Sequence, residues 1–339
     1  MTVTLKDVAA AAGVSVSAVS RSFTPGAPIA AATRSRILRI AARMGYQRNH
    51  LAAGLTTGRT RLIAMLVEVD TDPETLRFVS LLAERLAGEG LRPTLLHAPP
   101  GRDPRAVLRA LREHPPEAVV IASAAAHPAM ARALRGAGWP VVQALASQPA
   151  AADAPLVALG ETGVGRMAAS ILLSRGYRHL AFVGGPAVQP AIRDRWAGFR
   201  NLAERHGATI AVRFAAASSY AEGRREVLDL LAAGGADAYF CTDDRLAIGA
   251  LAALRESGVA VPDGAGLLGL GGIEAGGWTG IDLSTLAPPM DRMVTETAEL
   301  LLAALRGEPV AAPQRRFEAV LVERGTLRPP AARPALAAE

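Results

Sequence analysis

Short apolar runs alternate with stretches of helical periodicity along almost the whole chain from residue 62 onward. The clearest runs are LIAMLVEV from residue 62, AVVIA from residue 118, HLAFVGG from residue 179 and GLLGL from residue 266. Continuous apolar strands between helices are typical of parallel sheets that are buried on both faces. Roughly a dozen strands are more than one open sheet of this kind usually holds. The sequence therefore predicts an α/β core of two doubly wound subdomains.

This core is expected to span residues 62–329, with a tail over residues 330–339. We expect one subdomain at about 62–158 plus 288–315 and the other at about 159–287 plus 316–329. Ligands in such folds bind beyond the carboxyl ends of the strands, and two facing halves enclose a cleft. The core is therefore predicted to bind a small molecule.

The net charge of +6 is concentrated at the amino-terminal end of the chain. Residues 1–61 contain nine basic side chains and one acidic side chain, so this segment carries +8 and the other 278 residues carry −2. A compact basic segment on a slightly acidic body is typical of a module that binds a polyanion. A basic surface that only contacts solvent would have the same composition. The order of residues in the segment must therefore distinguish such a surface from a polyanion-binding module.

That pattern predicts a helix-turn-helix. Thr4 and Asp7 have the spacing of a capping box at the start of a first helix. Gly13 interrupts the helical periodicity, and Ser15 is placed to cap a second helix that begins at Val16. Two short helices joined by a turn with glycine place the second helix in a DNA major groove.

A third helix, from about Ala31 to Met44, is expected to close the small core, with Ile37, Leu38, Ile40, Ala41 and Met44 on its apolar side. Residues 1–48 are thus predicted to form an all-α DNA-binding head, followed by a hinge helix and linker over residues 49–61.

The runs TLKDVAAAAGVSVSAVSRSF, from residue 4, and TRSRILRIAARMGYQRNHLAAGL, from residue 33, closely resemble the heads of the lactose-repressor and galactose-repressor (LacI/GalR) family. The resemblance implies that Val16, Ser17 and Arg21 face base edges and that Leu55 wedges into the minor groove. The full set of DNA-contact positions implied in this way is Thr4, Leu5, Ser15, Val16, Ser17, Ser20, Arg21, Thr33, Tyr46, Asn49, His50, Ala52 and Leu55.

Two wedges need two chains, so the resemblance also implies a homodimer on a pseudo-palindromic double-stranded operator. Three positions depart from the family's common pattern. Arg48 replaces a proline, Ala30 replaces a capping serine, and Gly54 lies inside the hinge helix. Glycine there costs about 1 kcal/mol relative to alanine, which weakens the hinge helix.

The resemblance further implies a core similar to type I periplasmic sugar-binding proteins, with effector contacts at Arg195, Asp243 and Tyr220. Arg195 would donate hydrogen bonds to ligand hydroxyls or to a carboxylate. The alternatives are a surface ion pair of Arg195 with Asp194 or Glu204, and helix capping by Asp243.

Several pocket positions also depart from the family's usual residues. The chain has Gly269-Leu270-Gly271-Gly272 where relatives have Gly-Phe-Asp-Asp, and Gly160-Glu161 where they often have Asp-Asn. Pro288 and Met290 replace more polar or aromatic residues. Fewer fixed polar groups with a retained arginine favour an effector other than a simple hexose, and a sugar acid is the hypothesis.

Enzyme motifs are weak or missing in the sequence. The GxGxxG match at residues 264–269 precedes a strand, the GETGVGR run from residue 160 lacks the P-loop lysine, and neither GxSxG nor HExxH occurs. The six histidines have no metal-ligand spacing and Cys241 is the single cysteine. We therefore expect no enzyme, no metal and no cofactor.

The first residues, MTVTLKDVAA, lack the features of a secretory signal, and no apolar run is long enough to span a membrane. A cytoplasmic protein with no membrane partner is expected. The prediction is a transcriptional repressor of a carbohydrate or sugar-acid operon, controlled by a sugar or sugar acid. The alternatives are a ligand-binding protein, or an activator-type regulator of the same fold with a non-sugar effector.

Overall fold

The computed structural model describes residues 3–24, 26–46, 60–68, 72–98, 101–123, 127–149, 154–308 and 314–330. The chain divides into two compact units, Met1–Arg61 and Leu62–Glu339. Among the described residues, no helix has both the length and the apolar character needed to cross a membrane.

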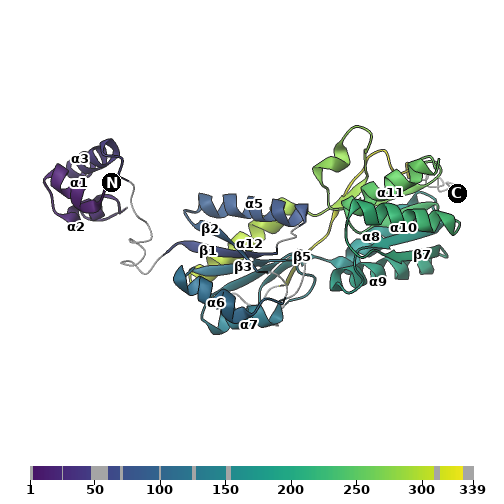
Figure 1. Ribbon diagram of the computed structural model, residues 1–339, viewed down its shortest axis with the longest axis horizontal. Helices are drawn as coiled ribbons and strands as arrows, with labels where there is room; N and C mark the ends of the chain where they lie inside the picture. Colours follow the sequence, from purple (N-terminus) through teal and green to yellow (C-terminus); the bar gives the residue numbers. More distant parts are fainter. Residues whose placement is uncertain are drawn as a thin grey trace, which may run out of the picture. The chain divides into compact units, whose positions relative to one another are not determined.

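The first unit contains three helices, α1 (Leu5–Ala12), α2 (Val16–Ser22) and α3 (Ala31–Arg43) (Figure 1). The predicted capping box is present, because Thr4 and Asp7 cap each other's backbone at the start of α1. Gly13 ends α1 in the left-handed region at φ 61°, which a glycine adopts without strain. The small core consists of Val8, Ala9, Ala12, Val19, Ile37 and Ala41.

Helix α3 differs from the expectation at Leu38 and agrees with it at Ala30. Leu38 is 37% exposed, so it does not belong to the apolar side that Ile37 and Ala41 bury. Ala30 makes no side-chain cap, which leaves the first backbone N–H groups of α3 without the usual acceptor.

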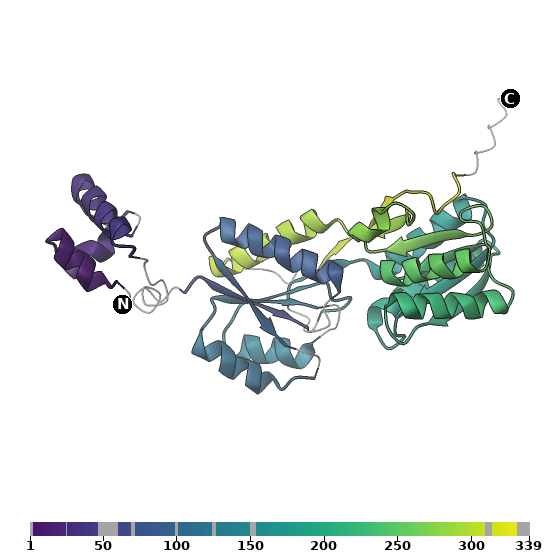
Figure 2. The same ribbon diagram turned by 45° about the horizontal axis from the view of Figure 1, so that its top comes forward.

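The second unit contains two six-stranded sheets among its described residues. The first sheet has the order β11-β5-β4-β3-β1-β2, and all its strands are parallel. Helices α5 (Pro73–Gly88) and α12 (Met290–Leu305) cover one face, and α6 (Pro104–Glu113) and α7 (Pro128–Gly136) cover the other (Figures 1 and 2). Its strands are β1 (Leu62–Val67), β2 (Arg92–His97), β3 (Ala118–Ala122), β4 (Val141–Ala144), β5 (Leu156–Leu159) and β11 (Gln314–Phe317).

The second sheet has the order β12-β10-β9-β8-β6-β7, with β12 antiparallel to β10. Its strands are β6 (His179–Gly184), β7 (Thr209–Phe214), β8 (Ala238–Cys241), β9 (Gly266–Leu270), β10 (Thr285–Ala287) and β12 (Val320–Val322). Its helices are α8 (Glu161–Ser174), α9 (Pro190–Arg205), α10 (Tyr220–Ala232) and α11 (Asp244–Glu256), and a 3-10 turn covers Glu274–Gly277.

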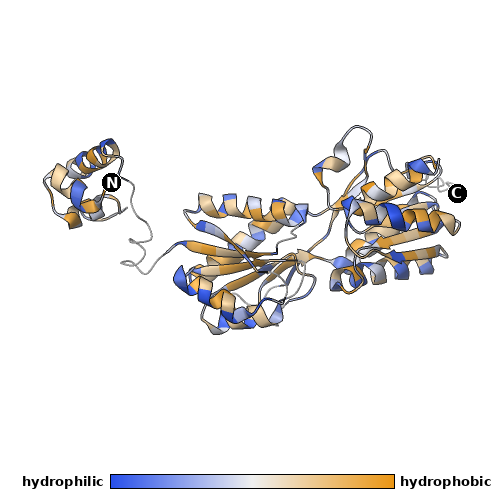
Figure 3. Ribbon diagram, in the orientation of Figure 1, coloured by the Kyte–Doolittle hydropathy of each residue, from blue (hydrophilic) through white to orange (hydrophobic). Residues whose placement is uncertain are grey.

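Alternate residues of each strand of this sheet enter different cores. Phe182 packs with residues of α8 and α9, whereas Ala181 and Val183 pack with residues of α10 and α11. Because both faces are covered, the central strands of both sheets are apolar along their length, as Figure 3 shows, whereas the edge strands β2 and β11 contain polar residues. The predicted two doubly wound subdomains are confirmed.

The chain crosses between the sheets after β5, which ends at Leu159, after β10, which ends at Ala287, and after β11, which ends at Phe317. The run FEAVLVERG, from residue 317, has its first residue in β11 of the first sheet and Val320–Val322 in β12 of the second. Strand β10 was not expected, because its three residues, Thr285–Ala287, are too few to form a recognisable apolar run.

Candidate functional site

Helix α2 exposes one side along its length. Val16 is 42% exposed, and Ser17, Ser20 and Arg21 are also exposed. The Ser15 hydroxyl caps the helix by accepting a hydrogen bond from the Ala18 amide at 3.2 Å. The predicted base-contacting residues therefore share the accessible side of a helix whose start is fixed by its own sequence.

The other predicted DNA-contact residues have varied surroundings. The Thr4 hydroxyl donates to the Asp7 carboxylate at 2.7 Å, Leu5 and Thr33 are half-buried, and Tyr46 packs its ring 5.5 Å from Phe23. The predicted contacts Asn49, His50, Ala52 and Leu55 lie outside the described residues, as do the departures at Arg48 and Gly54.

The basic side chains of α3 divide into two kinds. Arg36, Arg39 and Arg43 are exposed, whereas Arg34 donates to the carbonyls of Thr24 and Ala27 at 3.1 and 3.0 Å. Arg34 therefore stabilises the connection between α2 and α3. The exposed arginines give the head a positive surface suited to phosphates.

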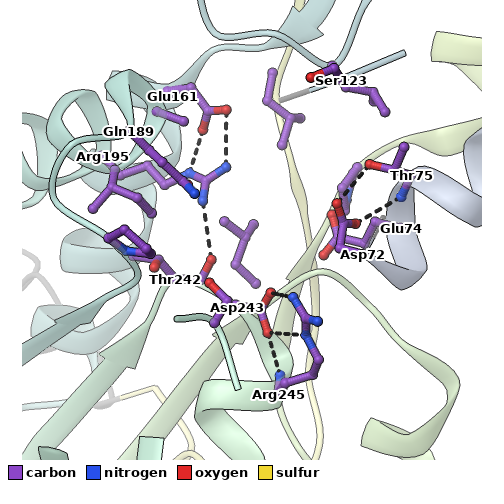
Figure 4. A pocket seen from close by; sticks show the side chains of 18 of the residues that line it. Asp72, Glu74, Thr75, Ser123, Glu161, Gln189, Arg195, Thr242, Asp243 and Arg245 are labelled. Carbon is purple, nitrogen blue, oxygen red and sulfur yellow. Dashed lines mark hydrogen bonds and ion pairs between the residues drawn. The ribbon is translucent and has the colours of Figure 1, made fainter. Parts of the chain in front are cut away.

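The core unit contains a cavity of about 540 Å³ between its two subdomains (Figure 4). This volume lies within the range of small-molecule sites. Its polar lining comes from both subdomains and consists of Glu68, Asp72, Glu74, Thr75, Ser123, Glu161, Gln189, Arg195, Ser218, Thr242, Asp243 and Arg245.

Arg195 is bound to a carboxylate that the sequence did not identify as its partner. Its Nε and Nη2 donate to the two carboxylate oxygens of Glu161 at 2.5 and 3.1 Å, and its Nη1 donates to the Thr242 carbonyl at 3.2 Å. Burial alone lowers the pKa of Arg195, but Glu161 outweighs this effect and the pKa is raised. The alternative of a surface ion pair with Asp194 or Glu204 is wrong, because the pair is internal and joins α9 to α8.

Two glycines make this pairing possible by letting α8 and α9 approach closely. A Cβ on Gly165 would lie 2.0 Å from the Arg195 carbonyl oxygen, and a Cβ on Gly198 would lie 2.0 Å from that of Thr162. Such distances exclude any side chain at either position. The start of α8 and the middle of α9 are therefore held together, which places Glu161 beside Arg195.

Asp243 caps α11 and also pairs with an arginine in the cleft. Its carboxylate accepts from the Arg245 amide at 2.7 Å and from the Arg245 guanidinium at 3.1 and 2.9 Å. The capping interpretation is confirmed, and the side chain still lines the cavity. Both arginines of the cavity lining are thus paired with carboxylates.

Asp244, the next residue, turns away from the cavity and fixes the loop after β9. It accepts hydrogen bonds from the amides of Gly272 and Ile273 at 2.7 and 3.0 Å and from the Thr285 hydroxyl at 2.7 Å. Burial raises its pKa despite these bonds. The chain thereby holds Gly271 and Gly272 at the edge of the cleft.

The opposite wall is formed by the start of α5. Asp72 caps this helix by accepting from the Thr75 amide and hydroxyl at 2.9 and 2.8 Å. Glu74, in the first turn, has a pKa well above its usual value, first because it is buried and then because Asp72, Asp243 and Asp244 are near. Figure 4 shows this group on the side of the cavity across from Arg195.

The third predicted effector residue, Tyr220, is not part of the cavity lining. It is 49% exposed at the first position of α10, and the same loop lines the cavity through Ala216, Ala217 and Ser218 instead. Sequence reasoning also missed Glu74, Gln189 and Arg245 as lining residues. These residues lie at or near the starts of helices that follow strands. This position could have identified them as lining residues, because ligands bind at that edge of a parallel sheet.

Within the described ranges, no group of three or more histidine, cysteine, aspartate or glutamate side chains is placed to hold a metal ion. Burial also raises the pKa of the Cys241 thiol, which keeps it protonated and unreactive. The polar lining of the cleft suits a polar molecule.

Comparisons with known proteins agree with both units. Residues 4–49 match the model of the bacterial regulatory proteins of the lacI family, and residues 169–327 match that of the periplasmic binding protein-like domain. The HTH-type transcriptional regulator PtxS of Pseudomonas aeruginosa is 31% identical over 333 residues, which cover 96% of each chain. The ribose operon repressor of Bacillus subtilis is 27% identical over 329 residues, which cover 96% of this chain and 98% of the relative.

The crystal structure of the lac repressor dimer bound to operator and the anti-inducer ONPF shares the fold, with a TM-score of 0.86 at 20% identity over 97% of this chain and 100% of that chain. A helix-turn-helix unit joined to a core of this kind defines a DNA-binding transcriptional regulator. The chain belongs to the LacI family of bacterial regulatory proteins.

Proposed function

We propose that this protein represses genes for the uptake or use of a carbohydrate, and that a small polyhydroxylated effector bound in the cleft controls its affinity for operator DNA. The observation that carries the proposal is the polar cavity, whose walls come from both subdomains of one core. A ligand that contacts both walls favours one arrangement of the subdomains over another, and this coupling also changes the affinity for DNA.

In the proposed DNA complex, two chains bind a pseudo-palindromic operator. One relative is named a ribose operon repressor, and the solved lac repressor is a dimer bound to operator, which supports this arrangement. Val16, Ser17 and Arg21 contact base edges, the polar residues around α2 and at the start of α3 contact phosphates, and Leu55 inserts into the minor groove. The functional division is a head over residues 1–48, a hinge over 49–61 and a core over 62–329.

In the proposed effector complex, Arg195 and Asp243 contribute as oriented polar groups. Arg195 has five N–H donors and uses three of them in hydrogen bonds to Glu161 and Thr242. The remaining donors can bind ligand hydroxyls. Because Glu161 balances its charge and Asp243 balances that of Arg245, the lining offers no uncompensated cation to a sugar acid, and a ligand without a carboxylate is favoured.

The test begins with selection of bound sequences from a random duplex library by the purified full-length protein. We expect an enriched palindrome whose affinity falls steeply with salt, because each neutralised phosphate releases counterions. Addition of a cleft ligand should then change that affinity. Failure to enrich any duplex, or affinity independent of salt, would refute the DNA-binding part of the proposal.

The test variant is Arg21→Ala in the head. The control variant is Arg205→Ala, which removes an exposed arginine at the end of α9. Arg21→Ala should lower operator affinity about tenfold or more, as expected for loss of a base contact. Arg205→Ala should leave it unchanged. A ligand that tightens rather than weakens DNA binding would identify a co-repressor, and one that leaves it unchanged would remove the regulatory claim.

A further inference from the structure

The cavity lining has an excess of negative charge. Among the described residues, five carboxylates line it, from Glu68, Asp72, Glu74, Glu161 and Asp243, against two guanidinium groups, from Arg195 and Arg245. Each guanidinium is paired with one carboxylate, Arg195 with Glu161 and Arg245 with Asp243. The chain's single lysine is Lys6, so no lysine of the core can compensate the remainder.

The remaining carboxylates lie on the wall formed by the first subdomain. Glu68 accepts a hydrogen bond from Ser123 and lies 3.3 Å from Nε2 of His127. Asp72 and Glu74 form no ion pair with any residue in the part of the chain that the structure describes. The unbalanced charge is therefore centred on these two residues at the start of α5.

Glu74 reaches across the cleft to a glycine of the other subdomain. An ideal Cβ on Gly271 would lie 2.1 Å from Oε1 of Glu74 and 3.2 Å from Oδ2 of Asp244. The space next to Gly271 is thus occupied by a carboxylate from the opposite wall, close to a second, buried carboxylate. Two acidic groups from different subdomains therefore lie close together beside Gly271, within the electrostatic reach of Arg195 and Arg245.

This arrangement discriminates between ligands by charge. An anion in the cavity would add repulsion to carboxylates that already repel one another. A cation placed between Asp72 and Glu74 would supply the missing counter-charge and would relieve the repulsion between Glu74 and Asp244. An organic cation with its own hydrogen-bonding groups would pair with these carboxylates and also bind the polar side chains of the other wall.

We propose that the effector is a polyhydroxylated molecule that carries a primary ammonium group, such as an amino sugar. The ammonium lies between Asp72 and Glu74, and the hydroxyl groups face Arg195, Gln189 and Ser218 on the other wall. This inference rests on the proposed function, since it names the chemical class of the molecule that occupies the same cleft.

The first test uses small probes that differ in charge, namely 2-aminoethanol, ethylene glycol and glycolate, at constant ionic strength and neutral pH. Thermal unfolding of the full-length protein should shift upward with 2-aminoethanol at concentrations at least tenfold lower than with the other two probes. Glu74→Gln should abolish this advantage. The control variant Glu84→Gln removes an exposed carboxylate of the same helix and should keep the advantage of 2-aminoethanol.

The second test is a calorimetric titration with a panel of hexosamines, the corresponding hexoses and the corresponding hexuronic acids. We expect the tightest ligand to be an amino sugar, bound at least tenfold more tightly than its neutral and acidic counterparts, with the difference lost in Glu74→Gln. Equal or tighter binding of glycolate or a hexuronate, absence of any preference for 2-aminoethanol, or a preference retained in Glu74→Gln would each overturn the inference.

The operator experiment separates this inference from the function on which it rests. If a neutral or acidic sugar changes operator affinity, the regulatory function stands and the charge assignment fails. If the cationic probes bind as expected but no duplex is bound, the charge assignment stands and the DNA-binding proposal fails.

Discussion

Arg195 donates to both carboxylate oxygens of Glu161, and only 14% and 4% of the two side chains are exposed. Arg195 comes from α9 and Glu161 from the first position of α8, so the pair joins two helices at the edge of the cleft. The guanidinium charge is balanced before any ligand enters. Arg195 therefore acts as an oriented hydrogen-bond donor and not as a free cation.

Replacing Glu161 with glutamine should destabilise the core. The change leaves the buried Arg195 charge without its counter-charge, and breaking a buried pair in this way costs about 3 kcal/mol. Urea unfolding of the full-length protein measures the loss. Glu256→Gln, which breaks the exposed pair with Arg224, is the control and should have no measurable effect. Equal stability of the two variants would show that the Glu161 pair is not needed for stability.

Glu74 should make the stability of the core depend on pH. Its folded-state pKa is raised above the ordinary 4.5, so the folded protein binds this proton more tightly than the unfolded chain does. The stabilisation is complete below pH 4.5 and is lost as the pH rises through the folded-state value. Glu74→Gln cannot lose the proton, so its Tm should exceed that of the wild type at pH 8 and approach it as the pH falls to 5. A Tm difference that stays constant over this range would contradict the prediction.

Two glycines on α8 should respond in opposite ways to alanine. A Cβ on Gly165 would collide with the Arg195 carbonyl, whereas a Cβ on Gly163 would meet nothing within 4 Å. Gly165→Ala should cost about 2 kcal/mol or more by forcing the helices apart. Gly163→Ala should raise stability by about 0.5–1 kcal/mol through better helix propensity. Denaturant midpoints distinguish the two, and destabilisation by both would show that the cost is not the helix contact.

Ala30→Ser should supply the cap that α3 lacks. Ala30 already has the extended conformation of a capping residue, at φ −60° and ψ 136°. A serine there can accept a hydrogen bond from the Thr33 amide, which is worth about 1 kcal/mol. Amide exchange at Thr33 in the full-length protein should slow about fivefold. The control variant Ala32→Ser places a serine inside α3, where it cannot cap the helix, and should not slow amide exchange at Thr33.

The sequence was sufficient to predict the helices of both units and the class of fold, because burial on two faces leaves a clear apolar pattern in strands such as β3 and β6. It failed where an element is short or where tertiary contacts decide its place. Strand β10 has three residues. Strands β11 and β12 are separated only by Glu318 and Ala319, neither of which signals a change of sheet.

The sequence predicted that a cleft lies between the two subdomains, but it did not predict how the charged side chains of that cleft are paired. Asp243 and Arg195 follow from the resemblance to the LacI/GalR family, whereas the partner of Arg195 lies 34 residues earlier in the chain. An acidic residue at a helix start is usually explained by the helix dipole, so Glu161 gave no sign of its pairing. Glu74 could not be found at all, since its significance depends on a glycine of the other subdomain almost two hundred residues away.

The last described strands, β11 and β12, lie at the edges of the two different sheets. Each sheet is therefore completed by chain from the carboxyl-terminal end of the core, and neither can be completed while residues 314–322 are still being synthesised. The subdomains consequently cannot finish folding one after the other as the chain leaves the ribosome. Their final assembly must wait for the end of translation, so a regulator with a truncated carboxyl terminus would lack a finished cleft in either half.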